Sequence, residues 1–309
     1  MSVERLSIVV PCYNEENNVK FLYKELIKVI DNLEYDYEII LVDDGSQDNT
    51  YVEIEKLAII NPKVVGISFS RNFGHQIALL AGLEKSRGDA VVTMDGDLQH
   101  PPKVIPDLIN KYLEGYDIVN TKRIDGDTTS LFKKMTSKWF YSLINRLSDI
   151  KVEPSSADFR LMSRETVNSF LKIKEHDRFT RGLISWIGFK QTIVDYTSSP
   201  RYSGKSSYTI KKMISLAVNG ITSMSSRPLR LSLYLGLIFF VTGIVYSFFI
   251  LINFFRGVNV EGWTSILITI LILGGIQLFI MSIIGEYVAR IFNETKARPL
   301  YIIKKSTHK

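Results

Sequence analysis

The sequence predicts a protein of two parts: an α/β domain with a mostly parallel sheet, then a hairpin of two membrane-spanning helices. Over residues 1–125, short apolar runs alternate with segments of helical periodicity. This is the pattern of a parallel sheet with helices on both faces. Two uncharged runs of 25 and 23 residues then follow, Leu231–Phe255 and Trp263–Gly285.

The elements of the α/β domain follow one another in strict alternation. Each apolar run has the length of a strand, and each segment between two runs shows the helical spacing of apolar residues. The expected strands are Leu6–Val10, Tyr37–Val42, Val64–Phe69, Ala90–Met94 and Ile118–Asn120, and the expected helices are Glu16–Leu33, Asn49–Ile60, Gln76–Lys85 and Pro102–Leu113.

Composition sets limits on function and location. The 309 residues are 46% hydrophobic and carry a formal charge of +6, so the chain is folded and suits phosphates or an anionic membrane, without excluding nucleic acid. The single cysteine, Cys12, excludes an intrachain disulfide and fits a reducing compartment, and its apolar surroundings favour a small core residue. The N-terminus lacks a signal-peptide pattern, so residues 1–200 are expected in the cytosol.

Polar clusters follow the first four expected strands. They are Pro11–Glu15, Asp43–Ser46, Ser70–Asn72 and Asp95–Gln99. Ligands of parallel sheets bind at the carboxyl ends of the strands. One cleft is therefore expected to collect all four clusters.

Asp95 and Asp97 suggest a metal site. Two carboxylates this close repel each other, and a divalent cation relieves the repulsion. Mg²⁺ and Mn²⁺ prefer oxygen ligands such as these carboxylates and the Gln99 amide. A simple Asp-rich turn is the alternative, and both interpretations stay open on position alone.

Three other clusters have structural and functional interpretations. Asp43, Asp44 and Ser46 are favoured as a turn that caps the next helix, and the alternative is that Asp44 accepts hydrogen bonds from a nucleobase or ribose. Asp158 lies in the expected strand 157–161, where an Asp158–Arg160 structural pair is favoured. Arg201 and Lys205 lie in a basic loop that either clamps a pyrophosphate or only links the domain to the membrane.

The two uncharged runs are each long enough to cross a bilayer, which needs about 20 helical residues. The link Arg256–Gly262 forces an antiparallel hairpin, and the basic residues flanking the hairpin place both termini in the cytosol. Buried core helices are the alternative. Two stripes, 131–147 and 210–224, suit helices on a headgroup layer or helices packed on the domain. The expected divisions are 1–200, 201–230, 231–290 and a basic tail, 291–309.

Six ordered motifs carry a family resemblance. The chain resembles the family-2 inverting glycosyltransferases, and among them the polyprenyl-phosphate type, relatives of dolichol-phosphate mannose synthase and bactoprenol glucosyltransferases. The motifs are VVPCYNEE at 9–16, VDDGSQDNT at 42–50, SRNFGHQIALLAGL at 70–83, MDGDLQHPP at 94–102, ADFRL at 157–161 and RYSGKSSY at 201–208. The resemblance implies a GT-A fold.

The resemblance also implies roles for individual residues. Asp95, Asp97 and Gln99 would hold the metal and the donor diphosphate, with Asp97 at the reaction centre. Arg201 and Lys205 would close on phosphates. The residues implied for the nucleotide pocket are Pro11, Tyr13, Glu15, Asp44 and Arg71; Asp158 is implied as catalytic base and Arg123 at the acceptor phosphate.

The implied reaction is transfer of a sugar from a UDP-sugar to polyprenyl (undecaprenyl) phosphate, with inversion, at the cytosolic membrane face. Glucose is the first expectation and N-acetylglucosamine the second, with Mg²⁺ or Mn²⁺ as cofactor. A homo-oligomer such as a tetramer is implied, and no nucleic-acid partner is expected. A phosphate monoester has its second pKa near ~6 and scarcely needs a base, so positioning is the physically favoured role of Asp158.

Two other functions remain as alternatives. A processive polysaccharide synthase would share the donor domain, but the sequence has no Gln-x-x-Arg-Trp motif and one hairpin cannot enclose a polymer channel. A non-catalytic membrane adaptor that binds nucleotides or acidic lipid is the other. The full acidic set at the strand ends argues against it.

Overall fold

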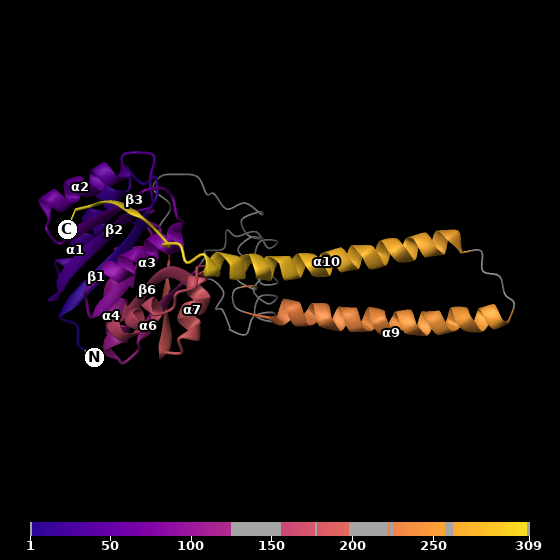
Figure 1. The fold of residues 1–309 in the computed structure, drawn as a ribbon. Helices are drawn as coiled ribbons and strands as arrows, with labels where there is room; N and C mark the ends of the chain where they lie inside the picture. Colours follow the sequence, from indigo (N-terminus) through magenta and orange to yellow (C-terminus); the bar gives the residue numbers. More distant parts are fainter. Residues whose placement is uncertain are drawn as a thin grey trace.

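The computed structural model describes residues 2–124, 156–176, 178–197, 222, 225–256 and 262–307. An α/β domain contains both ends of the described chain, and two long helices project from it (Figure 1). Arg201, Lys205 and the stripe at 131–147 lie outside the described residues, as does the stripe at 210–224 apart from residue 222.

A single sheet forms the centre of the domain. Within the described ranges it has eight strands in the order β7-β5-β6-β4-β1-β2-β3-β8. Pairing is parallel for β1 with β2 and β4, β2 with β3, and β5 with β7, whereas β6 and β8 pair antiparallel. The strands are β1 Arg5–Cys12, β2 Asp36–Asp43, β3 Val64–Phe69, β4 Ala90–Thr93, β5 Ile118–Arg123, β6 Ser156–Ser163, β7 Gln191–Tyr196 and β8 Ile303–Ser306. The five expected strands, the mostly parallel sheet and the strand predicted at 157–161 are confirmed.

Helices cover both faces of this sheet because successive strand residues point to opposite sides. Ile8 packs in one buried cluster with Leu22 of α1, and Val9 packs in the other with Leu80 of α3. The first face carries α1 Val19–Ile30, α2 Thr50–Ile60, the 3₁₀ turn η1 Pro102–Val104 and α4 Ile105–Leu113; the second carries α3 His75–Lys85, α6 Arg164–Leu171 and α7 Thr180–Trp186.

The C-terminal residues differ from the expected basic tail. Strand β8 pairs antiparallel with β3, and the Ser70 N–H just after β3 donates to the Ile302 carbonyl at 2.9 Å. The Tyr301 ring stacks on Phe69 with centroids 4.9 Å apart. The edge of β3 needs a hydrogen-bonding partner, and the β-branched pair Ile302–Ile303 suits a strand. The domain therefore does not end near residue 200, since its sheet is completed by residues that follow the hairpin.

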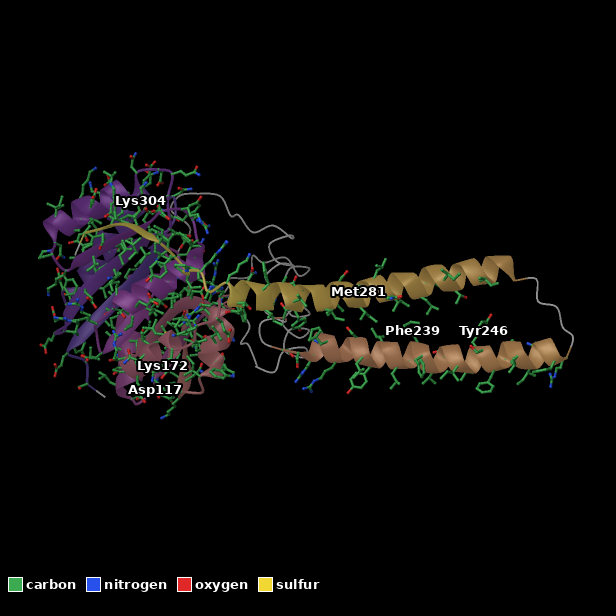
Figure 2. The ribbon with its side chains drawn as sticks, in the orientation of Figure 1. Asp117, Lys172, Phe239, Tyr246, Met281 and Lys304 are labelled. Carbon is green, nitrogen blue, oxygen red and sulfur yellow. The ribbon has the colours of Figure 1, made fainter. Side chains whose placement is uncertain are left out.

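The hairpin consists of α9 Arg227–Phe255 and α10 Trp263–Thr295, which run side by side (Figure 1). Phe239, Tyr246 and Met281 project from these helices (Figure 2). The segments Arg227–Asn253 and Ile272–Thr295 are long and apolar enough to cross a membrane, and 0% of either tested window is buried. Buried core helices are therefore the wrong interpretation. Both helices extend beyond the uncharged runs at the end nearest the domain.

Candidate active site

The loop after β4 lies near the middle of the sheet and carries Asp95 and Asp97. The Asp95 N–H donates to His100 Nδ1 at 3.0 Å, and Asp97 Oδ1 accepts the Gln99 N–H at 3.1 Å. Asp95 Oδ1 is a buried atom that accepts no hydrogen bond within the described part of the chain. His75 Nε2 lies 3.3 Å from this oxygen, and a buried carboxylate oxygen that accepts no hydrogen bond suits a cation.

The same loop lies against the end of β1. A Cβ on Gly96 would sit 3.3 Å from the Pro11 carbonyl oxygen and 3.4 Å from Cys12 Sγ. Leu98 has a φ of +63°, a conformation that residues other than glycine adopt infrequently. Cys12 itself is 1% exposed, as expected for a core residue, and burial raises the pKa of its thiol.

The loops after β1 and β2 are joined by reciprocal hydrogen bonds. The Asn14 N–H donates to Ser46 Oγ at 2.9 Å, and Asn14 Oδ1 accepts the Gln47 N–H at 2.9 Å. The Glu15 N–H donates to Thr50 Oγ1 at 2.8 Å. Tyr13, between these contacts, is 43% exposed. The predicted gathering of strand-end clusters is therefore present for β1 and β2.

Asp44 connects the loop after β2 to the start of α3. It is 1% exposed, and its carboxylate accepts the N–H groups of Phe73 at 2.7 Å and Gly74 at 2.9 Å. Burial raises the pKa of Asp44, and the two backbone donors oppose that shift. Asp44 thus shapes the loop that presents Arg71, whose guanidinium lies 4.0 Å from the centroid of the Phe73 ring.

Gly45 allows the loop after β2 to lie close against the loop after β3. Its φ is +66°, and a Cβ there would lie 2.3 Å from the Arg71 carbonyl carbon. Asp43, before it, accepts Ser46 N–H at 3.0 Å and Ser68 Oγ–H at 2.7 Å. The turn interpretation therefore describes Asp43, whereas Asp44 binds the backbone just before α3 and not a turn at the next helix, α2 Thr50–Ile60.

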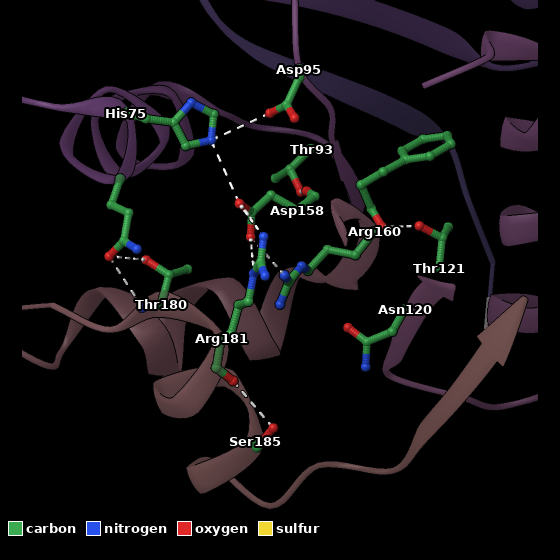
Figure 3. Close-up of polar contacts among 12 residues, drawn as sticks. His75, Thr93, Asp95, Asn120, Thr121, Asp158, Arg160, Thr180, Arg181 and Ser185 are labelled. Atoms are coloured by element: carbon green, nitrogen blue, oxygen red, sulfur yellow. Dashed lines mark hydrogen bonds and ion pairs between the residues drawn. The ribbon is translucent and has the colours of Figure 1, made fainter. Parts of the chain in front are cut away.

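A second cluster lies across β4, on β6 and α7. Asp158 Oδ1 accepts Nη2 of Arg160 and Nε of Arg181, both at 3.1 Å, and Oδ2 accepts Nη2 of Arg181 at 3.2 Å (Figure 3). The predicted Asp158–Arg160 pair is present. Arg181, the second partner of Asp158, was not predicted from the sequence.

The charges in this cluster stabilise one another. Burial alone would raise the pKa of Asp158, but Arg181 and then Arg160 outweigh it and hold the pKa well below its ordinary value. Burial lowers the pKa of Arg160 to about 10, against the opposing charge of Asp158. Asp158 and Arg160 are therefore both charged at neutral pH, and Asp158 is a weak proton acceptor.

His75 links the two clusters. As the first residue of α3 it places Nε2 3.3 Å from Asp95 Oδ1 and 3.7 Å from Asp158 Oδ2 (Figure 3). His100, on the other side of Asp95, stacks on the Phe159 ring with centroids 5.2 Å apart. Neither histidine was singled out from the sequence. Their positions beside two strand-end motifs, in NFGHQ and DLQHPP, were the available signal.

The remaining predicted residues are only partly brought together. Arg123 is the last residue of β5, not a residue after that strand, and it pairs in register with Tyr196 of β7. Within the described ranges, no group of three or more His, Cys, Asp or Glu side chains is arranged to hold a metal ion. A cation bound by Asp95 and Asp97 would therefore need oxygen ligands from a substrate.

Comparison with known proteins agrees with this architecture. The family described as glycosyl transferase family 2 matches residues 7–171, and the GtrB C-terminal hairpin matches residues 227–291. The first match spans the strand-end loops and Asp158, and the second spans α9 and most of α10.

Curated relatives match along nearly the whole chain. The bactoprenol glucosyl transferase of Shigella phage SfII is 43% identical over 98% of this chain and 98% of its own length. The prophage bactoprenol glucosyl transferase homolog of Escherichia coli K12 is 42% identical over 97% of this chain and 99% of its own. The uncharacterized glycosyltransferase YkcC of Bacillus subtilis is 42% identical over 97% of this chain and 93% of its own.

Among solved structures, a glucosyl-3-phosphoglycerate synthase from Mycobacterium tuberculosis is similar over 72% of this chain and 79% of its own. The TM-score is 0.48 and the identity 21%, too distant to transfer a residue or ligand. The family match and the near full-length relatives are sufficient by themselves to assign the chain to a family. The chain belongs to glycosyl transferase family 2.

Proposed function

We propose that this glycosyltransferase moves glucose from UDP-glucose to a bactoprenol-type polyprenyl phosphate, with inversion. The observation that carries the proposal is the likeness to bactoprenol glucosyl transferases, which includes the membrane hairpin as well as the catalytic domain. N-acetylglucosamine is the second candidate sugar, because no described residue is assigned to the sugar hydroxyls.

The donor would lie across the loops that follow β1, β2, β3 and β4. Asp95 and Asp97 would hold a divalent cation, Mn²⁺ or Mg²⁺, and the buried Oδ1 of Asp95, which accepts no hydrogen bond from the described residues, supports this assignment. Such a cation would neutralise charge that develops on the leaving diphosphate. Residues assigned to the nucleotide side are Pro11, Tyr13, Glu15, Asp44 and Arg71, with Gln99 beside the cation and Arg201 and Lys205 closing from the basic loop.

The reaction is one in-line displacement. An oxygen of the acceptor phosphate attacks the anomeric carbon, the bond from that carbon to the UDP oxygen breaks, and UDP leaves. The acceptor is mostly dianionic at pH 7, since the second pKa of a phosphate monoester is about 6. A base is unnecessary, and the depressed pKa of Asp158 supports a positioning role. Arg123 remains a candidate for the acceptor side.

The hairpin would anchor the domain where the lipid phosphate lies. The end of α10 lies at the domain, and the start of α9 is the end of that helix nearer the domain (Figure 1). Arg227 and Arg230 mark the first of these ends, Lys296 and Arg298 the second. Basic flanks favour the cytosolic side, so we assign the domain and both termini to the cytosol. Tethering raises the local concentration of acceptor. We also propose a homo-oligomer, with a tetramer as the first expectation.

The test is transfer of radiolabelled sugar by membranes that contain the full chain. UDP-glucose should label a chloroform-extractable lipid when polyprenyl phosphate is added, and UDP-N-acetylglucosamine should label it less. Asp95→Asn should abolish the labelling, whereas Asp107→Asn, at an exposed position of α4, should not. Label in polymer would indicate a processive synthase, and no label with any donor would indicate a non-catalytic adaptor. Either result contradicts the proposal.

A further inference from the structure

The Asp158 cluster lies on the side of Asp95 away from the donor loops. Donor-side residues follow β1, β2 and β3, which lie on one side of β4, and β6 lies on the other. His75 spans the two sides through its contacts with Asp95 and Asp158. A second substrate that attacks a sugar held at Asp95 would approach from the β6 side.

The two arginines of the cluster differ in exposure. The Arg160 side chain is 2% exposed and the Arg181 side chain is 26% exposed. Arg160 thus balances the buried charge of Asp158, whereas Arg181 reaches the protein surface. A guanidinium has five N–H donors in a rigid plane, so it can bind a carboxylate along one edge and a phosphate along another.

Arg181 is also fixed through its helix. Gln76 of α3 accepts hydrogen bonds from the N–H and the hydroxyl of Thr180, both at 3.3 Å. Ser185 Oγ donates to the Arg181 carbonyl at 3.2 Å (Figure 3). The first turn of α7 is thus held beside the first turn of α3, where His75 lies.

The segment before α7 touches the membrane hairpin. The His176 N–H donates to Oε1 of Glu294, in the last turn of α10, at 2.7 Å. The chain that leads to Arg181 is therefore attached to the end of a membrane helix. A phosphate at the headgroup layer would meet this side of the domain.

We propose that Arg181 binds the acceptor phosphate and that Asp158 acts by holding the Arg181 guanidinium in place. The inference rests on the proposed function and adds the residue that binds the anionic phosphate of the acceptor. Asp158 is then a positioning residue, because it acts through Arg181. Lysine is a poor substitute at position 181, because it cannot bind a carboxylate and a phosphate in the same plane.

The test is a double-mutant cycle in the full chain, with Arg181→Gln, Asp158→Asn and both together. For each variant, KM for polyprenyl phosphate, KM for UDP-glucose, UDP affinity and melting temperature are measured. Arg181→Gln should raise the acceptor KM about tenfold or more, the effect of losing one charge-assisted contact, and leave UDP affinity unchanged. The double variant should match Arg181→Gln within about twofold in kcat/KM for the acceptor.

Arg164→Gln is the matched control, since Arg164 is another part-buried arginine of the domain and donates to Gly88 and Ser86. It should leave both KM values unchanged. An Arg181→Gln variant with a normal acceptor KM, or additive losses in the double variant, would overturn the proposal.

If Arg181→Gln does not fold, Arg181→Lys decides, and it must show the same acceptor-specific rise in KM. Loss of UDP binding in both variants would make Arg181 purely structural and also overturn the inference. Failure of the proposed function looks different, because the wild-type chain itself would then transfer no sugar to the lipid.

Discussion

The two sides of the Asp95 loop are built from different interactions. On the donor side, carboxylates bind backbone N–H groups, as Asp44 does with Phe73 and Gly74. On the other side, Asp158 binds two arginine side chains, one of them almost fully buried. The first arrangement shapes loops. The second keeps buried charges paired, so removing a single partner there should lower the free energy of unfolding by more.

The largest effect is expected for Asp158→Ala. The change leaves the Arg160 guanidinium buried without its carboxylate, and breaking a buried pair in this way costs about 3–5 kcal/mol. Urea unfolding of the full chain in detergent measures it. Asp195→Ala, at an exposed position of β7, is the control and should change the free energy of unfolding by less than about 0.5 kcal/mol. Equal losses in both variants would contradict the buried-charge account.

A smaller effect is expected for Asp44→Ala on the donor side. Two backbone N–H groups lose their acceptor, at about 1–3 kcal/mol of stability. The start of α3 should loosen, so UDP should bind more weakly. Asp44→Asn keeps one acceptor oxygen, so its stability and its UDP affinity should lie between those of wild type and of Asp44→Ala. A loss as large as that of Asp158→Ala would remove the contrast between the two sides.

The residues on the donor side of the Asp95 loop could be predicted from the sequence more fully than those on the Asp158 side. Asp95, Asp97 and Asp44 each lie within a few residues of a strand that periodicity predicts, so their gathering could be foreseen. Arg181 comes 23 residues after Asp158, at the start of a seven-residue helix, and no local pattern relates the two. His75 was missed because its role arises from the packing of α3 on β1 and β2, which brings the first residue of the helix to Asp95 and Asp158.

The fold shows a similar limit. Alternating periodicity located the parallel strands, because burial on both faces leaves a strong local signal. Strand β8 was not predicted because residues 303–306 are exposed and contain a single apolar residue, Ile303, so that only pairing with the edge of β3 makes them a strand. The contacts of Tyr301 with Phe69 and Glu84 depend on positions more than 200 residues away.

The smallest effect is expected at an exposed ion pair at the start of the sheet. Asp36 lies 2.8 Å from both Arg5 and Lys63. Hydrogen bonds from Lys63 and then Arg5 lower the pKa of Asp36 to about 2. Because the folded-state pKa lies below the unfolded value, the stabilisation is complete above pH ~4 and disappears as the pH falls through ~2.

With 43% of its side chain exposed, Asp36 should contribute less than about 1 kcal/mol. Asp36→Asn should therefore unfold slightly more easily than wild type at pH 7 and converge with it in acid. The free energy of unfolding of both proteins is measured as a function of pH. A difference between them that stayed as large in acid as at pH 7 would contradict this assignment.

In the proposed site, Asp95 holds a cation together with the donor diphosphate. The UDP affinity of the full chain, measured by calorimetry with and without Mn²⁺, checks this assignment. Mn²⁺ should tighten UDP binding to the wild-type chain about tenfold or more, the effect of one charge-assisted contact, and should not tighten binding to Asp95→Asn. The same Mn²⁺ dependence in both proteins, or none in the wild type, would contradict the account.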